Sequence, residues 1–162
     1  MSGIIGRVGS RSGIINFQRP CGTARGNTNA TGAQTDYEFA SWSNVEQGNQ
    51  TYFNNSTGRF TAPIEGLYFF SAKFIKNNRG PVVRLYIRKN NASPSDADAA
   101  IQMRAEGQDD GGGNDGGNYA IASGSGIFQL DAGEFVSCWT QTGYFDGDRE
   151  YLTFSWMYIT TD

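Results

Sequence analysis

The sequence contains no histidine, and it has only two cysteines in 162 residues. The absence of histidine removes the usual general base at neutral pH, the Ser-His-Asp arrangement of hydrolases and most zinc sites. Two cysteines far apart in the chain, Cys21 and Cys138, make neither a metal cluster nor a disulfide framework. They either form one disulfide or remain free thiols, and we favour free thiols in a chain made in the cytoplasm.

Long apolar runs and catalytic motifs are also missing. No stretch approaches the roughly 18 apolar residues of a membrane-spanning helix, and the first residues contain too short an apolar core for a secretory signal. The glycine-rich stretch 111–117 is not followed by the Lys and Ser or Thr of a phosphate-binding loop. No motif orients two carboxylates for glycoside hydrolysis, and we therefore predict that the chain is not an enzyme and carries no cofactor.

Aromatic residues, glycines and short alternating runs are what the chain does contain. Aromatics make up 14% of the residues and there are 22 glycines, a composition typical of strands joined by turns. In the strongest run, 66–75, the even-numbered residues stay apolar throughout while the odd-numbered set ends in Lys73, so the even face is predicted to face the core. The predicted strands are 36–42, 59–62, 66–75, 82–88, 101–105, 119–130, 134–141 and 151–160. Their number, without a helical pattern, predicts an all-β sandwich, barrel or jelly roll.

Charge divides the chain into two parts. Before Asp36 there are four arginines and no acidic residue, whereas the remainder has nine basic and sixteen acidic residues. We therefore predict an extended N-terminal anchoring arm and linker in 1–35, with 20–34 as the linker, and a domain in 36–162. A flexible tail with a few solubilising charges is the alternative. Four spread arginines without interleaved aromatics do not favour nucleic acid as the partner. The candidate anchoring residues are Ile4, Ile5, Arg7, Arg11, Ile14 and Ile15.

One stretch is more specific than composition. In 52–70 a Thr57-Gly58 turn precedes Phe60, and a Pro-x-x-Gly step precedes two rings spaced two residues apart. Glycine suits the tight turn because it tolerates positive φ. This pattern resembles the signature of the C1q domain, in the C1q/tumour-necrosis-factor family. The residues that carry the resemblance are Gly58, Phe60, Pro63, Gly66, Tyr68 and Phe70.

The resemblance continues in order through 85–91, 128–136 and 151–159. It implies a ten-stranded jelly-roll sandwich that assembles as a homotrimer about aromatic-rich axial surfaces, with loops at one end available for binding. Trp156 stands where the family typically has glycine, which puts part of the axial packing in question. Four further aromatics either line the subunit interface or fill the monomer core: Trp42, Tyr52, Trp139 and Tyr144.

The stretch 108–118 is a candidate calcium site. Asp109, Asp110 and Asp115 place hard oxygen donors on a glycine-rich backbone, which suits calcium. Some C1q-like trimers hold calcium near their apex, so the resemblance is compatible with such a site. The spacing matches no EF-hand, and a solvated acidic loop is the simpler interpretation.

The start of the chain suggests a biological setting. The stretch 6–14, GRVGSRSGI, resembles short segments of virion proteins in tailed marine bacteriophages, which often carry C1q-like domains. We therefore expect a homotrimeric virion surface protein, made in the host cytoplasm and anchored to other virion proteins by its arm. It would serve as a capsid decoration or head fibre, or alternatively as a tail-fibre tip that binds a host-surface glycan or protein. A secreted C1q-like ligand or lectin is the second alternative.

Overall fold

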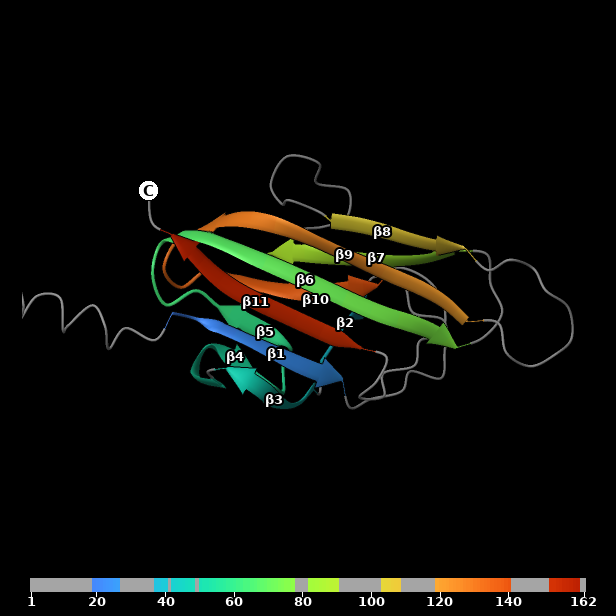
Figure 1. Ribbon diagram of the computed structural model, residues 1–162, viewed down its shortest axis with the longest axis horizontal. Helices are drawn as coiled ribbons and strands as arrows, with labels where there is room; N and C mark the ends of the chain where they lie inside the picture. Colours follow the sequence, from blue (N-terminus) through green and yellow to red (C-terminus); the bar gives the residue numbers. More distant parts are fainter. Residues whose placement is uncertain are drawn as a thin grey trace, which may run out of the picture.

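The computed structural model describes residues 19–26, 37–40, 42–48, 50–77, 82–90, 103–108, 119–140 and 152–160 (Figure 1). These residues form eleven strands and one short 3-10 helix, Gln50–Tyr52. In chain order the strands are β1 (Cys21–Gly26), β2 (Tyr37–Glu38), β3 (Trp42–Gly48), β4 (Phe53–Asn54), β5 (Arg59–Thr61), β6 (Gly66–Asn77), β7 (Val82–Lys89), β8 (Met103–Gln108), β9 (Tyr119–Leu130), β10 (Phe135–Thr140) and β11 (Thr153–Thr160).

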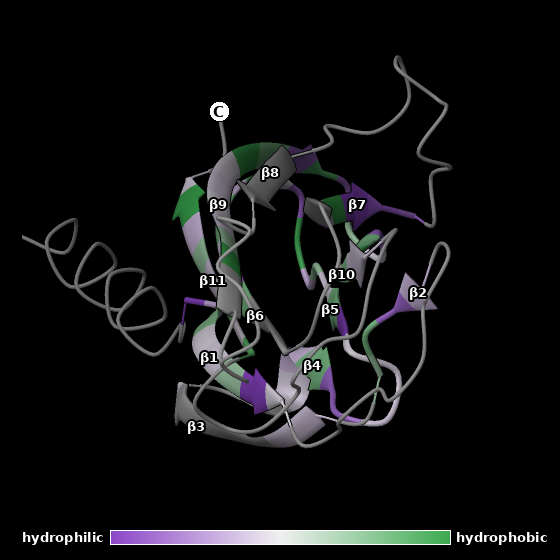
Figure 2. Cartoon of the chain, turned by 90° about the vertical axis from the view of Figure 1, so that its right-hand side faces the viewer, coloured by the Kyte–Doolittle hydropathy of each residue, from purple (hydrophilic) through white to green (hydrophobic). Residues whose placement is uncertain are grey.

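The strands form two sheets that face each other (Figure 2). One sheet has five strands in the order β3-β1-β11-β6-β9. The other has six strands, in the order β4-β5-β10-β7-β8 with β2 paired on β10. Every pairing is antiparallel, and the non-consecutive neighbours show the crossovers of a jelly roll. The predicted ten-stranded jelly-roll sandwich is confirmed. The structure adds β2, a strand of two residues that pairs with β10.

The side chains of β6 point alternately into and out of the sandwich, and its even-numbered residues lie in the core, as the sequence predicts. Tyr68, Phe70 and Phe74 are all 0% exposed, because successive side chains of a strand point to opposite faces and the even face meets the other sheet. Facing rings from other strands complete the core, with Phe53 stacked on Trp156 at 4.8 Å between centroids. Ring pairs of this kind add about 0.5–1.5 kcal/mol each beyond the area they bury.

Strand β1 corrects one prediction. The segment 20–34 was expected to be a linker, but Cys21–Gly26 pairs with both β11 and β3 and buries Ala24 completely. Its small residues show no apolar alternation, so only the neighbouring strands reveal it as a strand. The remaining arm, 1–18, and its six candidate anchoring residues lie outside the described residues.

A polar cluster fixes the turn that leads into β10. The Glu134 carboxylate accepts hydrogen bonds from the backbone N–H of Asp131 and the side-chain amide of Asn90, and it pairs with Lys89. Partial burial raises the pKa of Glu134, but these donors outweigh it and hold the pKa below the ordinary value. Glu134 thus ties the end of β7 to the start of β10.

Candidate functional site

The outer face of the five-stranded sheet is arranged in rows that cross four strands. The register aligns β9, β6, β11 and β1, so that residues of one chemical kind lie side by side. The apolar row is Ile127, Phe69, Met157 and Cys21. The hydroxyl row is Ser125, Ser71, Ser155 and Thr23, and the row beyond it is Ser123, Lys73, Thr153 and Arg25. We call these three rows the banded face.

The sheet carrying the banded face also carries the exposed large hydrophobic side chains of the described residues. Among the described residues the exposed large hydrophobic side chains are Ile121 at 53%, Ile127 at 53% and Met157 at 51%. Strand alternation places all three on the outer side of this one sheet. Phe69 lies half-buried between Ile127 and Met157, whereas Ile121 pairs with Ile75, three rows away from Ile127. Exposed apolar patches that are continuous rather than scattered mark surfaces for association.

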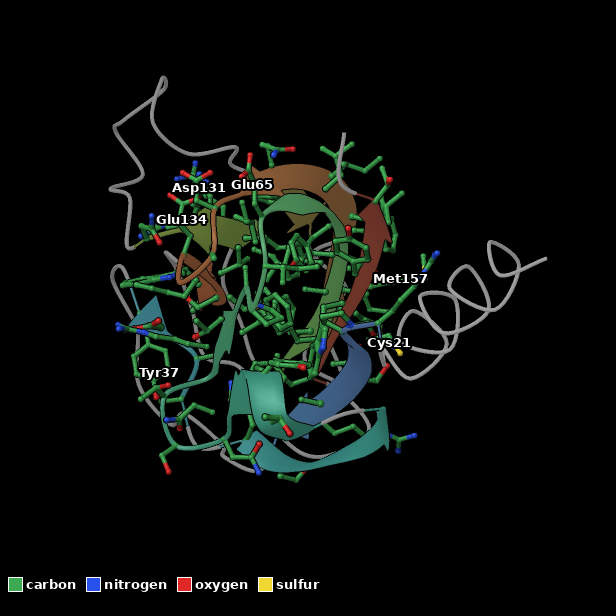
Figure 3. The ribbon with its side chains drawn as sticks, turned by 90° about the vertical axis from the view of Figure 1, so that its left-hand side faces the viewer. Cys21, Tyr37, Glu65, Asp131, Glu134 and Met157 are labelled. Carbon is green, nitrogen blue, oxygen red and sulfur yellow. The ribbon has the colours of Figure 1, made fainter. Side chains whose placement is uncertain are left out.

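A hollow of about 310 Å³ opens on the banded face. It is lined by Cys21, Gly22, Thr23, Gly48, Phe69, Ser155, Trp156 and Met157. Gly48 has a φ of +93°, and a Cβ atom there would lie 2.0 Å from the carbonyl oxygen of Cys21. Only glycine therefore allows β3 to approach β1 this closely. Figure 3 shows Cys21 and Met157 on the side of the sandwich away from Tyr37 and Glu134.

The outer side of the six-stranded sheet has a different character. Arg59 donates two hydrogen bonds of 2.8 Å to the Glu38 carboxylate, and its guanidinium lies over the Phe135 ring at 4.4 Å. Farther along, the buried Arg88 guanidinium lies 4.5 Å from the centroid of the Trp139 ring. Cation–π contacts engage both guanidinium groups, and an ion pair with Glu38 also engages Arg59, so the described residues on this side include charged groups held within the subunit.

The sequence left open whether four aromatic residues line the subunit interface or fill the monomer core, and the structure places three of them. Trp42 is 5% exposed and fills the monomer core, and Tyr52 packs against that core. Trp139 is half-buried on the outer side of the six-stranded sheet. Tyr144 lies outside the described residues.

Trp156 has a different role from the one the sequence suggested. It points between the sheets, is 2% exposed, and contacts Phe53, Phe60 and Phe154. The comparison with the family's usual glycine put part of the axial packing in question, and the structure places this ring in the core of the subunit. Alternation places the ring of Trp156 inside and its neighbour Met157 outside.

The signature residues gather around the turn into β5 and along β6. Phe60, Tyr68 and Phe70 are fully buried, and the Tyr68 hydroxyl donates to the carbonyl oxygen of Ile64 at 2.7 Å. Burial raises the pKa of Tyr68 to about 12. Gly58 is buried in the turn before β5 with a φ of +70°, whereas Pro63 is half-buried and Gly66 begins β6. In the structure all six residues shape the core and its turns.

The candidate calcium residues Asp109, Asp110 and Asp115 lie outside the described residues. Within the described ranges, no group of three or more Cys, Asp or Glu side chains could hold a metal ion. No helix in the same ranges has the length and apolar character needed to cross a membrane.

The two cysteines are free thiols, as favoured from the sequence: Cys21 is exposed at the hollow and Cys138 is buried. Burial, and then the charge of Glu38, raises the pKa of the Cys138 thiol well above its ordinary value. The Cys138 thiol therefore stays protonated and unreactive, while Cys21 remains accessible.

Sequence reasoning did not identify Ile121, Ile127 and Met157 as surface residues. A signal for the isoleucines was present, because they are six residues apart in one predicted strand and therefore share a face. Phe69 gave a second signal, since it is a large ring on the face of 66–75 that was not assigned to the core. Their alignment into one row depends on strand pairing, which the sequence did not provide.

The observed architecture is an antiparallel two-sheet jelly roll with a ring-filled core. The family model of the C1q domain matches residues 24–157, and the chain belongs to this family. C1q/tumour-necrosis-factor-like domains form homotrimers and act by binding rather than by catalysis.

Solved structures agree with this assignment at the level of the fold. The globular domain of the zebrafish complement 1qA protein is 16% identical, with a TM-score of 0.63 over 89% of this chain and 100% of that chain. The Eiger TNF of S. frugiperda is 10% identical, with a TM-score of 0.67 over 90% and 95% of the two chains. Murine APRIL is 8% identical, with a TM-score of 0.62 over 86% and 98%. A search of curated protein sequences finds no match.

Proposed function

We propose that the chain is a homotrimeric binding module that assembles through the banded face. The observation that carries this proposal is the apolar row of Ile127, Phe69 and Met157 on the outer side of one sheet, in which Ile127 and Met157 are half-exposed. Burying apolar surface contributes roughly 25 cal/mol per Å². A closed ring of three subunits removes this face from water in every copy.

A charge placed in the middle of the banded face tests the proposal. Met157→Lys puts an ammonium group on β11, the central strand of the five. Burying an unpaired charge costs several kcal/mol, and the trimer would bury three of them. We expect the purified variant to have the 17.7 kDa mass of one chain by light scattering, with the far-UV circular dichroism of the wild type.

Thr61→Lys is the matched control. Thr61 is exposed on β5 of the other sheet, so the same charge added there should leave the mass of the trimer unchanged. If both variants keep the wild-type mass, the banded face is not the interface. If both lose it, the effect of Met157→Lys is not specific to that face.

The proposed setting is the surface of a bacteriophage virion. Two features support it: residues 1–18 carry Arg7 and Arg11 and no acidic residue, and stretch 6–14 resembles phage virion segments. An arm of this charge suits docking on an acidic partner in the particle. In this role the arm anchors the trimer, and the jelly roll projects outward as a capsid decoration or head fibre.

Copy number tests this placement. Quantitative mass spectrometry of purified particles should find the chain in numbers proportional to the positions of the capsid lattice. A few copies per particle, located at the tail by immunogold labelling, would favour a tail-fibre tip that binds a host-surface glycan or protein. Absence of the chain from particles would reject the virion role without affecting the trimer.

A further inference from the structure

Two sulfur-bearing side chains lie opposite each other in the apolar row. Cys21 of β1 pairs with Met157 of β11, and beside this pair the backbone N–H of Tyr158 donates to the carbonyl oxygen of Pro20 at 2.8 Å. Hydrogen-bonded and non-hydrogen-bonded pairs alternate along an antiparallel ladder, so Cys21 and Met157 form a non-hydrogen-bonded pair. The Cα atoms of such a pair are only about 4.5 Å apart, and its side chains approach closely.

The next pair of the same kind shows how close these side chains come. Thr23 and Ser155 lie opposite each other on the same two strands, and their hydroxyl oxygens are 3.0 Å apart. Strand alternation places Cys21 and Met157 on the same outer face as Thr23 and Ser155. The thiol and the thioether can therefore meet at a single bound ion.

Both sulfur groups are accessible from solvent. Cys21 is an exposed free thiol, and Met157 is 51% exposed. Both line the hollow of about 310 Å³, which has room for an ion and the water molecules that complete its coordination. The thiol of Cys138 is 0% exposed and does not compete for such an ion.

The chemistry of the two sulfur groups selects the kind of ion. A thiolate and a thioether are soft ligands, which favour copper(I), whereas magnesium and calcium ions favour oxygen ligands. Among the described residues that line the hollow, none carries a carboxylate. Silver(I) has the charge and the softness of copper(I) and is not readily oxidised, which makes it a suitable probe.

We propose that Cys21 and Met157 form a binding site for copper(I), with the thiolate and the thioether as its protein ligands. A coordinated thiol loses its proton, so one proton leaves for each ion that binds. The ion brings one positive charge and the thiol loses one, so filling the site leaves the net charge of the apolar row unchanged. Both ligands belong to one subunit, and the site does not depend on the proposed trimer.

Titration of the reduced full chain with silver(I), in a chloride-free buffer, tests the site. Native mass spectrometry should find one ion bound per chain. In a weakly buffered solution, one proton should be released for each ion bound. Copper(I), supplied without oxygen and in competition with a chromophoric chelator, should bind with the same stoichiometry.

Two substitutions distinguish a paired site from a single thiol. Loss of an outer partner of a metal ligand already costs about 10–100-fold in affinity, and loss of a ligand should cost at least as much. We expect Met157→Leu, which conserves volume and apolar character, to weaken silver(I) binding at least about 10-fold. Cys21→Ser should weaken it at least about 100-fold. Met103→Leu is the matched control, because it changes a methionine of β8 in the other sheet, and it should bind silver(I) as the wild type does.

The methyl NMR signals of the three methionines report on the thioether itself. The signal that moves when silver(I) is added should be the one that is absent from Met157→Leu. The signal that is absent from Met103→Leu should stay in place. This measurement uses the wild-type chain and does not depend on the folding of a variant.

Each contrary result overturns the site. Unchanged affinity in Met157→Leu, or a Met157 signal that does not move, would show that the thiol binds alone. A wild type that binds no ion, or a Cys21→Ser variant that binds one as tightly, rejects the thiolate as a ligand. Light scattering with and without the ion keeps the two proposals apart. A trimer that binds no ion rejects the site and leaves the trimer, whereas a monomer that binds one rejects the trimer and leaves the site.

Discussion

Replacing Phe70 with alanine is expected to lower the free energy of unfolding by about 3–5 kcal/mol, the usual cost of truncating a fully buried ring. Phe70 is 0% exposed, and its ring centroid lies 5.3 Å from that of Phe128 and 5.4 Å from that of Phe60. Its stacking on Phe154, from β11, also disappears with the ring. For a domain of this size the loss corresponds to a fall of about 10 °C in Tm.

Phe69→Ala is the matched control, because it removes the same ring one residue earlier. Phe69 faces the outer side and lines the hollow, so the variant should keep the near-UV circular dichroism of the folded core. Its effect should fall on assembly instead, as a lower mass at low protein concentration. Both variants are compared at one concentration because assembly stabilises the folded state. Equal losses of core structure would contradict the assignment of the two faces of β6.

Replacing Gly58 with alanine is expected to lower the free energy of unfolding by about 3–5 kcal/mol, the sum of backbone strain and overpacking. Gly58 has a φ of +70°, which favours glycine, and the added methyl would lie 1.9 Å from the carbonyl oxygen of Phe39. That oxygen accepts a hydrogen bond of 2.7 Å from the indole N–H of Trp42. The methyl therefore displaces both the backbone and a core ring.

Gly133→Ala separates the two contributions. Gly133 has a φ of +90°, but nothing lies within 4 Å of a Cβ atom at that position. This variant should lose only the backbone contribution, about 1–2 kcal/mol. Denaturant unfolding followed by tryptophan fluorescence measures both variants. Equal destabilisation would show that the contact with Phe39 and Trp42 adds nothing.

Strands with clear alternation were predictable from the sequence. The range 119–130 was predicted with the observed bounds, and 66–75 was predicted with its core face correctly assigned. The turn at Gly58 followed from a motif whose geometry only glycine satisfies. In each case the information is local, since it lies in residues two to four positions apart.

Strand β1 and the role of Trp156 could not be predicted in this way. Cys21–Gly26 consists of small and polar residues, and it is a strand because β11 and β3 supply hydrogen-bonding partners on both sides. Trp156 was interpreted by comparison with the family's usual glycine rather than by alternation with its neighbours. Alternation through Phe154, Trp156 and Tyr158 gives the correct inward direction.

The banded face depends on register, which a single sequence does not specify. Ile127, Phe69, Met157 and Cys21 come from four strands far apart in the chain. A shift of one residue in any pairing would exchange an outward residue for an inward one. The candidate site therefore becomes visible only when the strands are paired.

The mass of the unmodified full chain in solution tests the central claim most directly. Light scattering after size-exclusion chromatography, repeated over a 100-fold range of loading concentration, gives this mass without reference to a shape. The account predicts three times the 17.7 kDa chain mass, with dissociation only at the lowest concentrations. A mass of 17.7 kDa at every concentration would contradict it, because the apolar face would then remain in water.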